Sequence, residues 1–189
     1  MKYNAFIEAE GILSQEFAFL AKAIGDNAIN PAMAYIHVEP SDKGEGLLGI
    51  VTDGRRLHLV DPLPEIYAHL GLTPGYWKVL KTTSKSAWLA RLDDSETKDW
   101  QFPSWRKVVP TEKAVYETEF VGFALTKTHH NSGKLSEFLH DLPEVTRIDL
   151  KFLYALGTDQ TWKLIWLGGL KPLKFIAVNR MAVIMPMQA

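Results

Sequence analysis

The sequence predicts an α+β fold of antiparallel sheets with two to three helices. Both ends of the chain show the same order of elements: a strand, a helix and then two strands. The strand-like runs are short and follow one another through polar turns, which is typical of antiparallel hairpins and not of a doubly wound parallel sheet. The two ends share no obvious sequence identity, so the repeat is expected in the structure only.

The first strand is expected at residues 4–12, with the first helix directly after it. Ser14 is a good N-cap residue, and Gly25 offers a stop. Between them, apolar residues recur at the spacing of one helix face: Phe17, Leu20, Ala21 and Ile24. This spacing predicts an amphipathic helix.

The following strands are separated by turn residues. Residues 34–38 alternate in polarity, and the run 47–60 is interrupted by Asp53-Gly54, a hairpin or bulge signal. Further strands are expected at 76–83, 86–92 and 115–125, with a polar turn at 93–98.

The C-terminal part predicts two more helices and two more strands. One helix is expected at 131–142, closed by Pro143. A capping box of Thr146 and Asp149 predicts the other, which ends at Gly157. The last strands are expected at 161–167 and 173–185, joined by Gly168-Gly169, and core packing is the expected use of Trp162 and Trp166.

The composition fits a globular protein of the cytoplasm. The chain has 189 residues, 47% hydrophobic and 23% charged, with a net charge of −1. The absence of cysteine excludes disulfides, thiolate catalysis and cysteine zinc sites. The N-terminal residues lack a signal-peptide run, and no apolar stretch reaches the ~18 residues of a membrane span. The near-neutral charge gives no global basic field for nucleic acid.

No catalytic, metal or cofactor site is predicted. The adjacent His129 and His130 have no further ligand at a metal-site spacing, so they are expected in solvent. The carboxylates of Asp93, Asp94 and Glu96 fall in a polar turn. Nucleophile elbows, phosphate-binding glycine loops and HExxH motifs are all missing from the sequence. The chain is therefore not expected to be an enzyme.

Three segments are more specific than this background: Val-Thr-Asp-Gly-Arg-Arg-Leu at 51–57, Phe-Pro-Ser-Trp-Arg-Lys-Val-Val-Pro at 102–110, and Val-Ile-Met-Pro-Met at 183–187. Each resembles a segment of the bacterial replicative sliding clamp, the beta subunit of DNA polymerase III. They occur in that family's order. The resemblance implies a DNA-clamp-like fold for the whole chain.

In the clamp family these segments line a hydrophobic groove that captures short motifs, a Gln followed by Leu and Phe, of replication and repair proteins. Carried over residue by residue, the groove would use Thr52, Gly54, Arg55, Arg56 and Leu57 from the first segment, Pro103, Lys107 and Val108 from the second, and Val183, Ile184 and Met185 from the third. Apolar side chains would accept the peptide, and the arginines would anchor its polar flanks. Lys107 stands where the family has arginine, so the peptide preference is expected to differ.

The chain is shorter than the family's three-domain subunit. We expect a single clamp-like domain over 1–189 with 63–145 as an elaborated insertion; the alternative is the fused, shortened remains of two domains. The family's ring around double-stranded DNA would need several copies, a homo-oligomer. Basic residues on the expected helices that would face phosphates are Lys22, Lys134, Arg147 and Lys151. Acidic neighbours on the same helices predict weak electrostatic binding.

The first functional hypothesis is therefore a clamp-like module that binds replication or repair proteins. It would act as a polymerase processivity factor if it oligomerises, or as a competitor for clamp-binding motifs. An enzyme of unknown type that uses 63–145 is an alternative, and so is a structural or assembly protein that kept only the fold.

Overall fold

The computed structural model describes residues 1–26, 30–121, 148–157 and 159–187. They form two compact units. The first unit comprises Met1–Trp105 and Asn179–Met181, and the second comprises Arg106–Val178 and Ala182–Ala189. Each unit is described by itself below.

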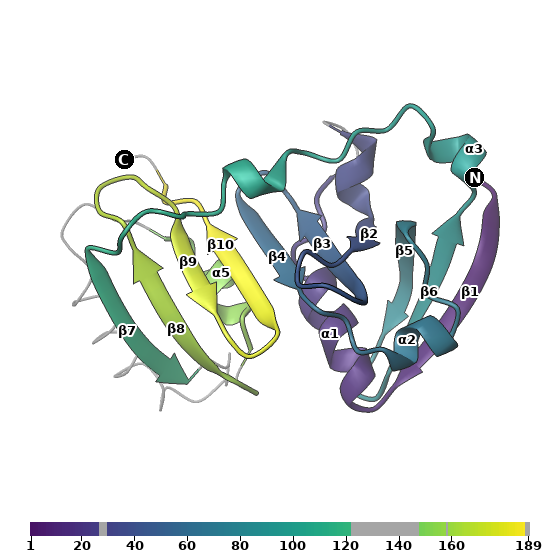
Figure 1. The fold of residues 1–189 in the computed structure, drawn as a ribbon, viewed down its shortest axis with the longest axis horizontal. Coiled ribbons are helices and arrows are strands. Elements are labelled where there is room, and N and C mark those ends of the chain that lie inside the picture. Colours follow the sequence, from purple (N-terminus) through teal and green to yellow (C-terminus); the bar gives the residue numbers. More distant parts are fainter. Residues whose placement is uncertain (27–29, 122–147, 158, 188–189) are drawn as a thin grey trace. The chain divides into compact units, whose positions relative to one another are not determined.

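The first unit is an antiparallel sheet with helices. Its strands follow the order β1-β6-β5-β2-β3-β4, with antiparallel pairing at each step (Figure 1). The strands are β1 Tyr3–Glu10, β2 Ile36–Pro40, β3 Leu47–Thr52, β4 Arg56–Val60, β5 Gly75–Thr82 and β6 Ser86–Leu92. The helices are α1 Ile12–Ala21, α2 Ile66–His69 and α3 Asp94–Thr97, with a 3-10 turn at Pro31–Ala34.

The second unit has the strand order β10-β9-β8-β7. β7 pairs antiparallel with β8, and β8 with β9. Its elements are β7 Tyr116–Val121, α5 Leu150–Tyr154, β8 Thr161–Trp166, β9 Leu173–Ile176 and β10 Arg180–Ile184. The residues of β10 divide between the units at Met181 and Ala182. The antiparallel sheets and short helices confirm the α+β class.

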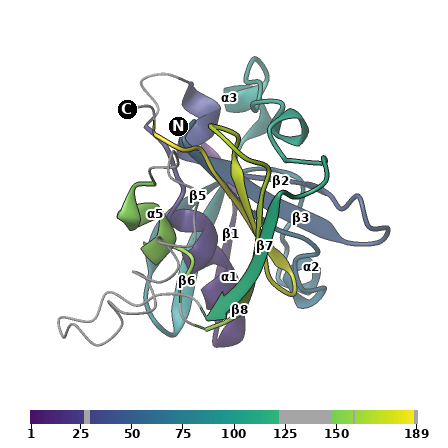
Figure 2. The same cartoon turned by 90° about the vertical axis from the view of Figure 1, so that its left-hand side faces the viewer.

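The helix α1 forms the core of the first unit. It lies against β1, β3, β4, β5 and β6 (Figures 1 and 2). Its Phe17 and Leu20 are fully buried, as the apolar spacing predicted, and Gly49 of β3 lets the Leu20 side chain approach the sheet. Burying side chains of this size stabilises the unit by roughly 1.5–3 kcal/mol each.

The predicted helix start was wrong by one turn. Gly11, with φ 61°, is the N-cap of α1, and Ser14 lies inside the helix. The Ser14 hydroxyl donates to the Gly11 carbonyl at 2.8 Å. The helix also ends before Gly25, at Ala21. A serine one turn into a helix satisfies its hydroxyl on the preceding turn, which the sequence cannot distinguish from a cap.

A second cluster of side chains holds the chain after α3 against the sheet. Tyr35, Tyr76 and Leu92 are buried, and Trp100 and Phe102 pack against them. The Trp100 ring lies 5.1 Å from the Tyr35 ring between centroids, and the Phe102 ring stacks on His37 at 5.0 Å. The segment that precedes Trp105 is therefore fixed on the first unit.

Further corrections concern the C-terminal part. The final strand expected at 173–185 is two strands, β9 and β10, separated by a turn that ends at Asn179. Asp149 is the N-cap of α5, and its side chain accepts from the Lys151 amide at 3.1 Å. It is therefore not the N3 residue of a capping box with Thr146 as the N-cap. The helix expected at 131–142 lies outside the described residues. Trp162 and Trp166 are buried, as expected.

The region 63–145, expected as an insertion, contributes α2, β5, β6 and α3 to the first unit and β7 to the second. Its status as an insertion stays a prediction. Among the described residues, no helix has the length and apolar character needed to cross a membrane.

Candidate peptide-binding site

The first segment forms the tight turn between β3 and β4. Asp53 organises it: its Oδ1 accepts from the amides of Arg55 and Arg56 at 2.9 Å each, and its Oδ2 accepts from the Arg56 side chain at 3.0 Å. The Thr52 hydroxyl donates to the Arg56 carbonyl and accepts from the Gly54 amide. The predicted Asp53-Gly54 hairpin is confirmed, with Gly54 at φ 83°, a conformation that favours glycine.

The hairpin lies close to the chain after α1. A Cβ on Gly25 would lie 2.9 Å from Asp53 Cα and 3.1 Å from the Thr52 carbonyl oxygen. Both are backbone atoms, which cannot move aside as a flexible side chain can. Gly25 thus serves a close backbone approach instead of the expected helix stop.

The hairpin exposes only some of the residues that the resemblance implied. Gly54 and Arg55 are exposed. Leu57 is buried in the first unit, and Arg56 is held by Asp53 with its side chain 13% exposed. Arg55 is therefore the more accessible of the two cations.

The second segment contains a short turn and no strand. Residues Trp105–Lys107 form a 3-10 turn, and the buried Trp105 donates from Nε1 to Glu39 Oε1 at 3.2 Å. Pro103 is half-buried, whereas Lys107 and Val108 are exposed, Val108 by 44%. Trp105 is thus buried and keeps a polar contact at the edge of its indole ring.

The third segment combines a buried strand end with an exposed tail. Val183 and Ile184 of β10 are buried, while Met185 is 38% exposed and Met187 45%. Among the predicted groove residues, the exposed apolar side chains are thus those of Val108 and Met185.

The predicted peptide-binding residues divide between the units. Thr52, Gly54, Arg55, Arg56 and Leu57 lie together in one hairpin of the first unit, which also holds Pro103. Val183, Ile184 and Met185 are consecutive in the second unit, which also holds Lys107 and Val108. A single site made of all three segments stays a prediction.

The predicted DNA-contacting residues are only partly described. Lys22 is exposed directly after α1. Lys151 forms an ion pair with Asp149 at 2.8 Å, and its ammonium lies 5.0 Å from the Phe152 ring centroid. Lys134 and Arg147 lie outside the described residues, as do His129 and His130.

His58 of β4, directly after the first segment, is a buried polar residue. The His58 Nδ1 lies 2.8 Å from the Phe19 carbonyl oxygen, and the two rings stack at 4.2 Å. Burial lowers the pKa of His58 from 6.5 to about 3, so the ring is neutral and Nδ1 donates. No partner for Nε2 is present among the described residues. The ring is fully buried in the core of the first unit.

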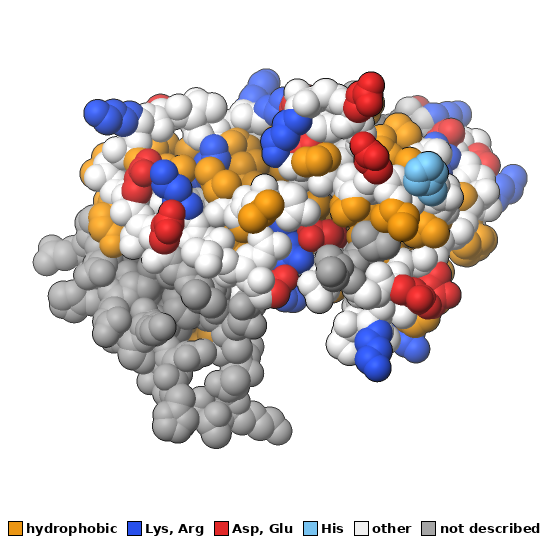
Figure 3. Space-filling model, turned by 60° about the horizontal axis from the view of Figure 1, so that its bottom comes forward, with side chains coloured by type: hydrophobic (Ala, Val, Ile, Leu, Met, Phe, Trp, Pro, Cys, Tyr) orange, Lys and Arg blue, Asp and Glu red, His pale blue; other side chains and the backbone are white. Residues whose placement is uncertain are grey.

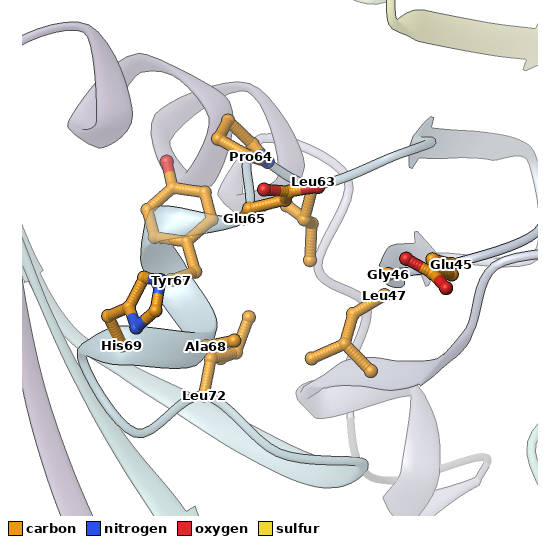
Figure 4. Close-up of a pocket in the computed structure, with 10 residues that line it drawn as sticks. All are labelled: Glu45, Gly46, Leu47, Leu63, Pro64, Glu65, Tyr67, Ala68, His69 and Leu72. Carbon is orange, nitrogen blue, oxygen red and sulfur yellow. The ribbon is translucent and has the colours of Figure 1, made fainter.

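A hollow that no sequence pattern predicts lies beside α2. Its volume is about 330 Å³, and Leu47, Leu63, Tyr67 and Leu72 supply apolar walls (Figure 4). Glu45, Glu65 and His69 add polar groups. Exposed apolar and acidic side chains also occur side by side on the face that comes forward in Figure 3. The hollow depends on a helix of four residues, which is too short to give a periodic pattern.

The residues that the structure describes include no group of three or more His, Asp or Glu side chains arranged to hold an ion.

Several solved structures that match this chain in fold are bacterial sliding clamps. The DNA polymerase III beta chain of Streptococcus pneumoniae matches with a TM-score of 0.58 at 10% identity, over 100% of this chain and 66% of its own. The fold is clamp-like. The clamp of Bartonella birtlesii bound to griselimycin matches at 0.55 and 11% identity, over 68% of its length. The Helicobacter pylori clamp bound to a DNA ligase peptide matches at 0.55 and 14% identity, over 66% of its length.

The likeness lies in the fold and not in the overall sequence. No protein-family model matches the chain, and no curated protein matches it by sequence. The chain spans about two thirds of the length of the clamps it matches.

Proposed function

We propose that this protein is a clamp-like binding module that captures short peptide motifs of replication or repair proteins. The observation that carries the proposal is the order of the three segments in a chain with a clamp-like fold. Each segment alone is short and could arise by chance. The proposal assigns the protein no catalytic role.

The chemistry of the accessible residues suits an apolar peptide with a polar or acidic flank. Met185 is flexible and polarisable and can adapt to a Leu or Phe side chain. Val108 adds a second exposed apolar surface, and each buried peptide side chain would gain roughly 1.5–3 kcal/mol. Arg55 supplies an exposed guanidinium, and Gly54 leaves the backbone accessible beside it.

The kind of partner is proposed from the neighbours in fold. The Helicobacter pylori clamp was solved with a DNA ligase peptide. A protein of replication or repair that carries a similar linear motif is the partner we propose for this chain.

A processivity role would be added only if several copies assemble around DNA. Of the two described candidate phosphate contacts, Lys151 is already paired with Asp149. The proposal therefore places peptide capture first and DNA encirclement second.

A labelled peptide with Gln followed by Leu and Phe tests the proposal by fluorescence anisotropy. We expect saturable binding that Met185→Asp and Val108→Asp each weaken at least tenfold, about 1.4 kcal/mol. Val115→Asp is the matched control, since Val115 is 70% exposed in the second unit and outside the three segments. The proposal fails if Met185→Asp and Val108→Asp bind the peptide as tightly as the control Val115→Asp. It also fails if the wild type shows no saturable binding.

The first unit is tested with a charge reversal. Arg55→Glu should weaken a peptide with an acidic flank more than one with a neutral flank, because it removes an exposed cation. Lys85→Glu, at another exposed position of the first unit, is its control. Leu57 is unsuited to this test, because an aspartate there would disrupt the core.

A further inference from the structure

The hollow beside α2 is a concave feature of the first unit alone. Its lining residues all fall within 45–47 and 63–72. Leu63, Tyr67 and Leu72 line it with buried side chains, and Leu47 adds a half-buried wall (Figure 4). The volume of about 330 Å³ falls within the roughly 300–1,000 Å³ that is typical of small-molecule sites.

The end of α2 fixes one wall of the hollow. The Gly71 amide donates to the Ala68 carbonyl at 3.0 Å, and the Leu72 amide donates to the Tyr67 carbonyl at 2.8 Å. These two bonds, with Gly71 at φ 91°, form a Schellman motif, which turns the chain back on the helix. The motif places Leu72 beside Tyr67, so this wall is formed by local backbone bonds.

The connection between β2 and β3 supplies the other wall, and backbone bonds fix it as well. The Leu63 amide donates to the Leu47 carbonyl at 2.7 Å, and the Ser41 amide donates to the Gly46 carbonyl at 3.1 Å. The Ser41 hydroxyl donates to the buried Asp61 carboxylate. Both walls are therefore held without a ligand, which lowers the entropic cost of binding one.

The charges at the hollow are negative. Glu45 and Glu65 are exposed lining residues from the two walls, and the described lining residues include no lysine or arginine. Lys43 of the β2–β3 connection instead donates to the Asp61 carbonyl at 2.6 Å. Among the described residues, neither Glu45 nor Glu65 forms an ion pair. Carboxylates beside apolar walls concentrate a negative potential, which attracts a cation.

We propose that the hollow binds a small organic cation, an amine that carries an aromatic ring. The ring contacts the leucine side chains of the two walls, and the ammonium group lies at the carboxylates of Glu45 and Glu65. A ring buries more apolar surface in a hollow of this size than the methylene chain of a lysine does. Charge complementarity and preformed apolar walls thus select the same ligand class.

This site is separate from the proposed peptide-binding residues. None of its lining residues belongs to the segments 51–57, 102–110 or 183–187. The inference therefore stands or falls independently of peptide capture.

Titration with tryptamine at neutral pH, followed by amide chemical shifts, tests the proposal. Tryptophol carries the same indole ring without the charge, and indoleacetate carries the opposite charge. Tryptamine should bind saturably, shift residues 45–47 and 63–72, and bind about tenfold more tightly than tryptophol, with indoleacetate the weakest. Equal affinity for the three compounds, or tryptamine shifts confined to other residues, would overturn the proposal.

Charge-neutral variants test the two carboxylates. Glu45→Gln and Glu65→Gln should each weaken tryptamine about threefold and leave tryptophol unchanged, because each removes one charge at the rim. Glu96→Gln is the control, since Glu96 is an exposed residue of α3 outside the hollow. Glutamine variants that bind tryptamine as tightly as this control would contradict the assigned ligand charge.

A variant that fills the hollow tests the location. Ala68→Phe places a ring in the hollow from an exposed position of α2 and should weaken tryptamine and tryptophol alike. Circular dichroism checks that the variant is folded. Unchanged binding by the folded variant would place the ligand elsewhere.

The amide of N-acetyl-lysine distinguishes a small aromatic amine from a lysine side chain of a protein partner. It should bind at least about tenfold more weakly than tryptamine. Equal or tighter binding would assign the hollow to a basic side chain of another protein and overturn the small-molecule proposal.

Discussion

The guanidinium of Arg180 donates to the carboxylate of Glu16 although 164 residues separate the two. The Nε distance is 2.8 Å, and a second bond from the same group measures 3.3 Å. The side chains are only 2% and 5% exposed, and the guanidinium also lies over the Phe19 ring. The ion pair thus fixes the start of β10 to α1 within the first unit, although the two elements lie far apart in the sequence.

Glu16→Ala should lower the free energy of unfolding by about 3–5 kcal/mol, because it leaves Arg180 as a buried charge without its carboxylate. Urea unfolding followed by fluorescence measures the loss. Glu16→Leu with Arg180→Met removes both charges and should recover most of the stability. If the double variant is at least as unstable as Glu16→Ala, the isolated charge is not the cause.

The buried His58 predicts a pH dependence of stability. The ordinary pKa of 6.5 applies in the unfolded chain, and burial lowers the pKa to about 3 in the folded protein, with repulsion from Arg56, Lys22 and Arg180 acting in the same direction. Between these values the unfolded chain binds a proton that the folded protein rejects. Stability should therefore fall as the pH drops below ~6.5, with a slope approaching ~1.4 kcal/mol per pH unit.

The control for this pH dependence is His58→Phe, which keeps the stack on Phe19 and cannot be protonated. We expect lower stability at neutral pH and a shallower slope between pH 6.5 and 3 than in the wild type. If the free energy of unfolding changes with pH by the same slope in both proteins, His58 is not the cause of the pH dependence.

Gly25→Ala should displace the hairpin of the first segment. The added methyl would lie within 3.1 Å of the backbone of both Thr52 and Asp53, and such overpacking costs roughly 1–3 kcal/mol. Amide chemical shifts of residues 52–57 should change more than those of β1. Unchanged shifts in the hairpin would show that the chain accommodates the methyl elsewhere.

The sequence predicts local features better than contacts between distant residues. The β3–β4 hairpin was predicted because Asp53 and Gly54 act within four residues. The start of α1 was missed because Ser14 and Gly11 both suit a helix end, and only the hydrogen bond between them separates the two cases. The turn before β10 was missed because the apolar residues on both of its sides look like one strand.

Prediction of the site was limited for the same reason. The three segments were predicted from their resemblance to known motifs. A motif indicates which residue types are present and does not indicate which of their side chains are exposed. Leu57 and Ile184 looked suited to an apolar groove, yet both are buried in the fold. The ion pair of Glu16 and Arg180 joins residues far apart in the chain. The hollow beside α2 depends on a helix too short to give a periodic pattern.

Photo-crosslinking tests directly whether the three segments bind a peptide. A peptide with Gln followed by Leu and a photoreactive phenylalanine is irradiated with the wild-type protein, and the labelled residues are identified by mass spectrometry. We expect labels within 52–57, 103–108 and 183–185, and we expect excess unlabelled peptide to remove them. Labels confined to the hollow beside α2, or labels that excess peptide does not remove, would contradict it.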